Sequence, residues 1–439
     1  MKPFPNSICS NNDRMIKDIT NKQNTMINLK MKLPGPSVAS ALKRIEKHIG
    51  LYDPPYPFVY GGKGQGVYCE DLDGNTFMDW VSQIACQPLG YNHPRMLEVA
   101  KKYSNKSPLK LAGHDYYSIE HIELLEEVAS TLPEELQSIF LINSGAEAVE
   151  NAIKIAYRKK PSAKVGISVH GAFHGRTLGA LSCTNSKTAQ KKNYPEIPVR
   201  RISLNNADEL NRLLKYDVYP ENVAYVIAEA IQGEGGYKFA DKQWLQDLRT
   251  VTQTHNIPLI LDEVQAGMGR TGKWWAFQHA GIVPDIITSG KSLQVAATIG
   301  KKSMFPTESS SISSTWGGGD LINMAMGLEI IKTIKEENLL EKIKIKGEYL
   351  LKRLKELEQK YSIVTNARGL GLLLAFDLPN GEIRNKLVEL NFEKGLLTLG
   401  CGPHSMRIIP PYIISENEID EGINILNENL KLLGDGKGK

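Results

Sequence analysis

The alternation of apolar and polar segments along the chain predicts an α/β fold. Between residues 111 and 311, short aliphatic runs alternate with longer segments whose apolar positions recur at helical spacing. This alternation is typical of a large domain built on a doubly wound, mainly parallel sheet. The clearest strand is Val223–Ala230, which is apolar at nearly every position, as expected for a parallel strand buried on both faces.

The N-terminal and C-terminal parts follow a different pattern. Segment Gly66–Asp79 contains two short strand-like runs joined at Asp73-Gly74, which is a strong hairpin signal. After residue 320, two long helical segments precede a strand at Gly369–Phe376. The last helix opens with a capping box formed by Ser415 and Glu418. These elements predict a second, smaller α+β domain.

We therefore expect four segments along the 439 residues. They are an N-terminal arm (1–32), the N-terminal part of the small domain (33–110), the large domain (111–320) and the C-terminal part of the small domain (321–439). The arm is polar and rich in Asn and Lys, so it is predicted to be loose or to cover a partner subunit. The glycine-rich run Gly61–Gly66 lacks the spacing of a nucleotide-binding loop and is interpreted as an ordinary loop.

Charge and cysteine content exclude several classes of protein. The 53 basic and 49 acidic residues leave a net charge of +4, spread along the chain, which argues against a nucleic-acid-binding protein. The five cysteines are odd in number and scattered, so neither a disulfide framework nor a metal site is indicated, and a reducing cytoplasm fits best. No apolar stretch is long enough to cross a membrane, and no signal peptide is recognised.

An acid and a lysine each follow a strand-like run in the middle of the chain. Asp262 follows Ile257–Leu261, and Lys291 comes shortly after Pro284–Thr288. The helix-length segment Gly267–Gly281 lies between them, so the runs are predicted to form a βαβ unit with both side chains at the ligand-binding edge of the sheet. This pairing suits pyridoxal phosphate, which a lysine holds covalently while an acid contacts its ring nitrogen. Taken alone, Lys291 also fits a solvated loop residue.

A candidate phosphate site lies where the apolar run Phe140–Ile142 passes into a helix at Ser144, Gly145 and Ala146. The first N–H groups of a helix lack partners within it, and the positive end of the helix dipole lies there, so an anion binds well. Small residues let a phosphate approach the backbone. The same residues, judged alone, also fit an ordinary helix start.

Two more segments supply candidate residues. Phe173 lies between glycines after a strand-like run, where a ring can stack on a planar cofactor, and Arg176 can offer paired N–H donors to a substrate carboxylate. Each alone also fits a structural role, in the core or in a surface ion pair. Glu234 follows the apolar strand described above, so Glu234, Asp262 and Lys291 are predicted to face one crevice.

Seven motifs, in order, give the chain a resemblance to the class III, or ω-, aminotransferases of pyridoxal-phosphate fold type I, from about residue 54 to residue 433. The motifs are Asn-Ser-Gly-Ala-Glu-Ala148, Phe-His-Gly-Arg176, Gln-Gly-Glu-Gly-Gly236, Leu-Asp-Glu-Val-Gln265, Ser-Gly-Lys291, Ser-Thr-Trp-Gly-Gly318 and Arg-Ile-Ile-Pro-Pro411. Within the class, three features resemble the L-lysine 6-aminotransferases: the run Lys291–Val295 in place of a glycine-rich stretch, Trp316, and Ala375–Pro379.

The resemblance implies which residues hold the cofactor. Lys291 carries it through the ε-amine and, once released, moves the reacting proton, while Asp262 bonds its ring nitrogen and Gln265 lies near its phenolic oxygen and the substrate. The phosphate is held at the helix start, and the ring is contacted from the segment after the neighbouring strand. These further cofactor-binding residues are Ser144, Gly145, Ala146, Phe173 and His174. Thr315 of a neighbouring subunit also reaches the phosphate, which implies a homodimer with shared active sites.

The resemblance also implies how two unlike substrates use one site. Arg176 takes the distant carboxylate of the amino donor, and Arg407 takes the carboxylate beside the reacting carbon of 2-oxoglutarate. Glu234 pairs with Arg407 in the first step and swings aside in the second.

The expected activity is L-lysine 6-transamination with 2-oxoglutarate. Its products would be 2-aminoadipate 6-semialdehyde, which cyclises to piperideine-6-carboxylate, and glutamate. The open alternatives are another ω-amine donor (ornithine, acetylornithine or 4-aminobutyrate), a class III amino-acid racemase, and a catalytically silent cofactor-binding protein.

Overall fold

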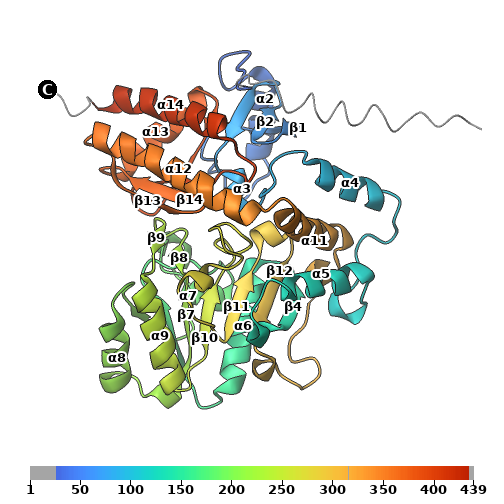
Figure 1. Ribbon diagram of the computed structural model, residues 1–439, viewed down its shortest axis with the longest axis vertical. Coiled ribbons are helices and arrows are strands. Elements are labelled where there is room, and N and C mark those ends of the chain that lie inside the picture. Colours follow the sequence, from blue (N-terminus) through green and yellow to red (C-terminus); the bar gives the residue numbers. More distant parts are fainter. Residues whose placement is uncertain (1–25, 315, 435–439) are drawn as a thin grey trace, which may run out of the picture.

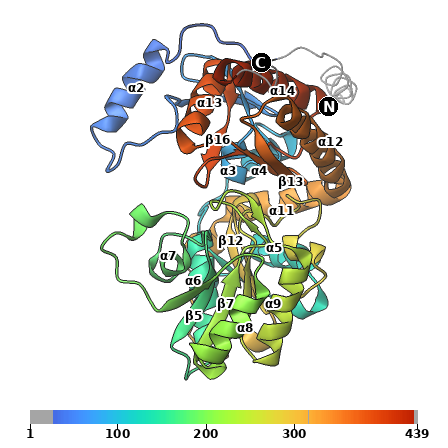
Figure 2. The same ribbon diagram turned by 90° about the vertical axis from the view of Figure 1, so that its left-hand side faces the viewer.

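The computed structural model describes residues 26–314 and 316–434, so most of the predicted N-terminal arm, and Thr315, lie outside the described residues. Figure 1 shows a lower lobe, coloured green to yellow, and an upper lobe in which the blue N-terminal and orange-red C-terminal segments lie together. Figure 2 shows the same two lobes after a quarter turn. None of the described helices is both long and apolar enough to cross a membrane.

The lower lobe is built on a seven-stranded sheet with the order β4-β12-β11-β10-β7-β5-β6. Neighbours from β11 to β6 run parallel, whereas β12 is antiparallel to both β11 and β4. The strands are β4 (Ser138–Ile142), β5 (Val165–Val169), β6 (Val199–Ile202), β7 (Val223–Ala228), β10 (Leu259–Asp262), β11 (Ile286–Ser289) and β12 (Ala296–Gly300). The predicted mainly parallel α/β sheet is confirmed.

Helices cover both faces of this sheet (Figure 2). Helix α6 (Gly145–Lys159) packs across β4, β12, β11 and β7, and it buries Val149, Ala152, Ile153 and Ala156, the apolar face that its sequence predicts. Its opposite face meets solvent. The other helices of the lobe are α4 (Pro94–Tyr103), α5 (Ile119–Ala129), α7 (Leu178–Cys183), α8 (Ala207–Tyr216), α9 (Lys242–Thr254), α10 (Trp316–Gly319) and α11 (Leu321–Glu336).

The upper lobe joins the two ends of the described chain. Its first sheet has the order β1-β2-β3-β15, so a C-terminal strand pairs with an N-terminal hairpin, and its second has the order β13-β14-β17-β16. The strands are β1 (Tyr60–Gln65), β2 (Tyr68–Asp71), β3 (Thr76–Asp79), β13 (Thr365–Leu370), β14 (Leu373–Asp377), β15 (Leu396–Leu397), β16 (Leu399–Cys401) and β17 (Ser405–Ile408). The helices are α2 (Pro36–Glu46), α3 (Ser82–Ala85), α12 (Leu339–Lys360), α13 (Gly381–Glu393) and α14 (Glu416–Leu433). A two-stranded ribbon consists of β8 (Ile231–Gln232) and β9 (Lys238–Phe239).

One predicted hairpin and one predicted helix are confirmed in this lobe. Strands β2 and β3 pair antiparallel around the predicted Asp73-Gly74 turn. Helix α14 begins after Ser415, whose hydroxyl accepts the Glu418 N–H while the Glu418 carboxylate accepts the Ser415 N–H. The predicted domain boundaries at residues 32, 110 and 320 stay predictions.

Two glycine-rich segments differ from their prediction. Gly61–Gly66 is not a loop, because most of it forms β1, which pairs with β2. A Cβ at Gly61 would lie 2.2 Å from the Asp71 carbonyl oxygen, so glycine permits a close approach of two strands there. The predicted single strand Gly369–Phe376 is a hairpin instead, in which β13 and β14 pair antiparallel around Gly371.

The predicted helix between Asp262 and Lys291 is also wrong. In the segment Gly267–Gly281, every residue of which is described, the only regular element is the 3-10 turn Ala276–His279. Met268, Gly269 and Gly272 have φ values of 58°, 91° and 83°, which no right-handed helix accommodates. The two strands are nevertheless parallel neighbours, so the predicted spatial relation holds.

The turn at Gly371 generates a prediction on stability. Gly371 has φ +56°, and a Cβ there would lie 2.6 Å from the Arg270 carbonyl oxygen. Gly281 has φ +69° but open space around it. We expect Gly281→Ala to cost about 1 kcal/mol, from backbone strain alone, and Gly371→Ala roughly 2 kcal/mol or more, from strain and collision together. Thermal melts of both variants check this, and equal losses would contradict the described turn.

Candidate active site

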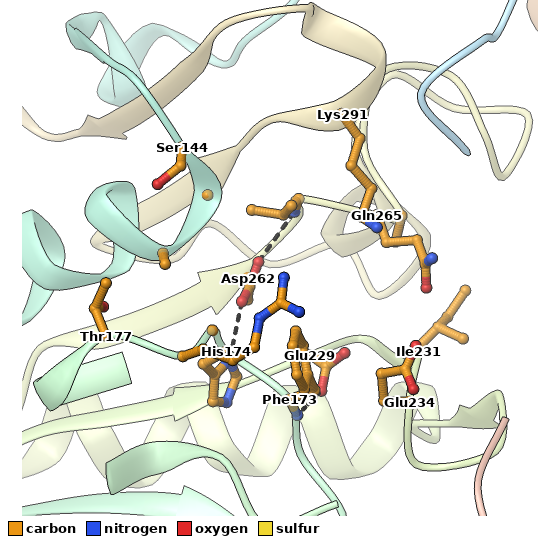
Figure 3. A pocket seen from close by; sticks show the side chains of 16 residues that line it. Ser144, Phe173, His174, Thr177, Glu229, Ile231, Glu234, Asp262, Gln265 and Lys291 are labelled. Atoms are coloured by element: carbon orange, nitrogen blue, oxygen red, sulfur yellow. Dashed lines mark hydrogen bonds and ion pairs between the residues drawn. The ribbon is translucent and has the colours of Figure 1, made fainter. Parts of the chain in front are cut away.

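A cavity of about 430 Å³ opens at the carboxyl ends of β7, β10 and β11 (Figure 3). Most of the predicted site residues line it. They are Ser144, Gly145, Ala146, Phe173, His174, Arg176, Glu234, Asp262, Gln265 and Lys291. Arg407 is not among the lining residues, but it donates a hydrogen bond to Glu234, which is. The cavity therefore collects residues that follow five strands of the large sheet: β4, β5, β7, β10 and β11.

Asp262, the last residue of β10, is buried in the cavity wall, and three donors fix its carboxylate. Its Oδ1 accepts the Val264 N–H and the Thr288 hydroxyl, each at 3.0 Å. Its Oδ2 lies 2.9 Å from His174 Nδ1. Because a carboxylate oxygen accepts, Nδ1 carries the shared hydrogen. Asp262 thus has a single orientation toward the cavity.

Lys291 lies beyond β11, and its side chain points down into the cavity from the top of Figure 3. Its backbone is left-handed, with φ 45°, which is rare for a residue with a side chain. Burial lowers the pKa of its ammonium group. The Nζ atom donates to the Ile84 carbonyl at 3.2 Å. An amine with a lowered pKa is more readily a nucleophile or a base.

The helix start has the geometry of an anion site. Ser144 is the N-cap of α6, and its hydroxyl accepts the Glu147 N–H at 3.3 Å. A Cβ on Gly145 would lie 2.9 Å from the Val264 side chain, so glycine lets the helix start approach the Asp262 loop. Ser144, Gly145 and Ala146 all line the cavity.

Phe173 and Arg176 come from the segment after β5. The guanidinium carbon of Arg176 lies 5.9 Å from the centre of the Phe173 ring, and Arg176 is exposed. Among the described residues no ion pair is found for Arg176. Its charge is therefore available to a ligand in the cavity.

Glu234 contacts two cations. Its Oε1 accepts from Arg407 Nη1 at 2.7 Å, and its Oε2 lies 2.9 Å from Lys187 Nζ. Burial acts to raise the pKa of Glu234, but the neighbouring Arg407 and Lys187 outweigh it and hold this pKa below its ordinary value. Arg407 is buried on β17, so this pair joins the upper lobe to the cavity.

Two residues near the cavity were not predicted from the sequence. Glu229 lines the cavity, and its carboxylate accepts the N–H groups of Phe173 and Gly233, both at 2.9 Å. Its position directly after the buried strand β7 is the same signal that marked Glu234, and it could have been found. Lys187 lies on a polar surface segment and carries no such signal. No group of residues able to hold a metal ion occurs in the described ranges.

The residues present fit pyridoxal phosphate. The cofactor needs an amine, an acid for its ring nitrogen, an anion site for its phosphate and a surface for its ring. Lys291, Asp262, the start of α6 and Phe173 offer these groups around one cavity. Figure 3 shows Lys291, Ser144 and Phe173 arranged on different sides of Asp262.

Glu229 generates a prediction on pH dependence. Burial raises the pKa of its carboxyl to about 7, above the value of roughly 4.3 in an unfolded chain. Between these values the folded chain holds the extra proton, so the native protein loses stability as the pH rises. Glu229→Gln removes this loss. The free energy of unfolding of the variant minus that of the native protein should therefore rise by roughly a few kcal/mol from pH 5 to pH 8, and its melting temperature relative to native should rise with it.

The comparison uses cofactor-free protein and thermal melts at each pH. Glu98→Gln, at an exposed position of α4, is the control and should show no such trend. A difference between Glu229→Gln and native that stays constant with pH would contradict a raised pKa at Glu229.

Comparison with known proteins agrees with this geometry. The class III aminotransferase family model matches residues 52–430. The chain is 34% identical to an acetylornithine aminotransferase of Caldanaerobacter subterraneus over 84% of this chain and 93% of that protein. It is 29% identical to an alanine/serine racemase of Pyrococcus horikoshii, over 91% and 92%.

Among solved structures, a lysine aminotransferase from M. tuberculosis superposes with a TM-score of 0.84 at 28% identity, covering 90% of this chain and 99% of that one. A match to the family over most of the chain, together with this fold, identifies both the class and its cofactor. The chain belongs to the class III aminotransferases, pyridoxal-phosphate-dependent enzymes of fold type I.

Proposed function

We propose that this ω-aminotransferase takes the terminal amine of a diamino acid, with N-acetylornithine or ornithine as the first candidate, and transfers it to 2-oxoglutarate. The acetylornithine aminotransferases that it resembles at 32–34% identity support this donor class. L-lysine, which the sequence led us to expect as the principal donor, therefore becomes the second candidate. Both candidates carry an α-carboxylate several bonds away from the reacting amine.

The observation that carries the proposal is the ion pair of Glu234 with Arg407, 2.7 Å apart in a largely buried position. A bare arginine would repel the ammonium group of an incoming ω-amine donor. A paired arginine presents no net charge to it, so the donor enters a cavity whose nearest cation is neutralised. A 2-oxo acid needs the opposite state, with Arg407 free to bind the carboxylate beside its carbonyl.

Lys187 supports such an exchange. It already bonds the second oxygen of Glu234, so the carboxylate that leaves Arg407 keeps one cationic partner. The cost of separating the buried pair is then smaller than for a carboxylate left alone. In the donor step, the exposed Arg176, which forms no ion pair within residues 26–314 and 316–434, binds the distant carboxylate of the substrate.

The remaining residues hold the cofactor and move a proton. Pyridoxal phosphate supplies an electron sink for the charge that develops on the substrate carbon. In our proposal Lys291 binds the cofactor and carries a proton on Nζ, Asp262 and His174 fix the ring nitrogen, and Phe173 covers the ring. Gln265 orients the oxygen side of the ring, and the backbone N–H groups of Gly145 and Ala146 bind the phosphate, with Ser144 beside them. A partner subunit's Thr315 would complete the phosphate site in a homodimer.

L-lysine is the second candidate donor. The superposition on the lysine aminotransferase of M. tuberculosis supports it, as does the resemblance of the run Lys291–Val295 to that subgroup. Lysine and ornithine differ from N-acetylornithine in their free α-ammonium group. A site that prefers a neutral amide at that position would therefore discriminate against both.

A donor panel tests the proposal directly. The cofactor-loaded protein is mixed with N-acetylornithine, ornithine, lysine, 4-aminobutyrate and alanine in separate single-turnover experiments, and the absorbance of the cofactor is followed. We expect the acylated or free ornithine to react at least about tenfold faster than 4-aminobutyrate, which lacks the α-amino group. Fastest reaction with alanine, or isomerisation of alanine without any oxo acid, would contradict an ω-aminotransferase and favour a racemase.

The ion pair gives a second prediction. Glu234→Ala leaves Arg407 buried and unpaired, so the donor half-reaction should slow by roughly tenfold or more while the 2-oxoglutarate half-reaction changes little. Rapid-mixing measurements of the two half-reactions check this. Glu308→Ala is the matched control, because it removes a glutamate–arginine pair with Arg158 on the exposed surface. Equal slowing of both half-reactions in Glu234→Ala would refute the exchange mechanism.

A further inference from the structure

The short element α3 (Ser82–Ala85) is a left-handed turn, and it contacts Lys291 of the cavity. Ser82, Gln83, Ile84 and Ala85 have φ values of 44°, 51°, 58° and 67° in succession. Residues with a side chain rarely adopt this conformation even singly, and four in a row are held only where the surroundings force them. Such strain is concentrated at functional sites, and it persists only where surrounding contacts hold the backbone in place.

Asp79 holds the beginning of the turn. Its buried carboxylate accepts the N–H groups of Val81, Ser82 and Gln83 at 2.7, 2.9 and 3.2 Å. It also accepts the Tyr91 hydroxyl at 2.7 Å. These contacts come from the upper lobe alone and place the turn against the lower lobe.

The lysine segment holds the end of the turn. Three successive carbonyls accept side-chain hydrogen bonds from it: Ile84 from Lys291 Nζ at 3.2 Å, Ala85 from the Ser292 hydroxyl at 2.9 Å, and Cys86 from Gln294 Nε2 at 2.9 Å. Gln294 also donates to the Lys291 carbonyl at 3.1 Å, and it is left-handed itself, with φ 68°. Ser292 and Gln294 thus bind the same short turn that accepts the lysine amine.

We propose that Ser292 and Gln294 are positioning residues for Lys291. They clamp the left-handed turn so that the Ile84 carbonyl receives the free ε-amine and keeps it at the cavity whenever it is not bound to the cofactor. The clamp acts in both half-reactions, because the released amine has to return to the same place in each. This inference rests on the proposed role of Lys291 as the residue that binds the cofactor.

The ionisable groups around the lysine amine stay unchanged in the test. They are Cys86, Arg407, Glu234 and Asp262. Gln294→Ala removes the donor to Cys86, and Ser292→Ala removes the donor to Ala85. Gln246→Ala is the matched control, since Gln246 Nε2 donates to the Ala280 carbonyl at 2.9 Å and lies outside the cavity lining.

The first measurements use cofactor-free protein. Amide hydrogen exchange of residues 83–87 should quicken about tenfold in Gln294→Ala, as for the loss of one hydrogen bond. The pH profile for labelling Lys291 with an amine-selective reagent, read by peptide mass, should move to lower pH because the ammonium group loses a fixed acceptor. Gln246→Ala should leave both unchanged. Faster exchange without a shift in the Lys291 profile would overturn the proposal and leave a purely structural role.

The loaded enzyme then separates this inference from the proposed function. Borohydride reduction of native protein should attach the pyridoxyl mass to the Lys291 peptide, and its absence would refute the role of Lys291 itself. With that role established, Gln294→Ala should lower the rates of both half-reactions by the same factor and leave KM nearly unchanged. A selective effect on one half-reaction would refute the clamp. Should Ser292→Ala fail to fold at its buried position, Gln294→Ala, at a half-buried one, carries the test.

Discussion

The register between β10 and β11 is the constraint on which the cavity depends. Asp262 pairs with Thr288 in the parallel ladder, and the Thr288 hydroxyl donates to the Asp262 carboxylate at 3.0 Å. Alternate residues of a strand point to opposite faces, so a shift by a single residue would turn the acid away from the lysine that follows β11. Both strands are fully buried, and burial of their apolar side chains on two faces makes any other register costly. Sheet packing thus sets the spacing of the chemical groups.

The second constraint acts between the lobes. Arg407 comes from a strand of the upper lobe, and Glu234 lies between β8 and β9, in the segment that follows β7 of the lower lobe. Arg407 is buried and its charge is balanced by Glu234, so the pair aligns the lobes as well as setting the charge of the cavity. The left-handed turn at Ser82–Ala85 adds a second junction, in which hydrogen bonds from Ser292 and Gln294 to backbone carbonyls join the lobes. Alignment of the lobes and charge of the site are therefore governed by the same contacts.

Signals that depend on local sequence located much of this arrangement. Apolar strands that end in an ionisable residue revealed Asp262, Glu234 and the lysine region, since burial of a strand is encoded in its own residues. The capping residue Ser144 was equally local. Glycine-rich segments were interpreted less well, because glycine in Gly61–Gly66 serves close strand pairing, which depends on a partner strand. The role of individual motifs came from family resemblance rather than from pattern.

Contacts between distant segments could not be predicted in this way. Lys187 meets Glu234 only through the tertiary fold, and nothing in its neighbourhood in the sequence distinguishes it from other solvated lysines. The left-handed turn is similarly hidden, since Gln83 and Ile84 have no intrinsic preference for positive φ. Their conformation is held in part by the nearby Asp79 carboxylate and in part by a donor more than two hundred positions away along the chain.

The antiparallel strand β12 has a consequence for how the lysine travels. Ser289 of β11 pairs with Ala297 of β12, so the chain that carries Lys291 is anchored in the sheet on both sides of a six-residue connection. A connection tethered at both ends cannot slide toward a ligand without breaking ladder hydrogen bonds. In the proposed function, the amine therefore reaches and leaves the cofactor through rotation of its own methylene chain, while the backbone stays in place through every turnover.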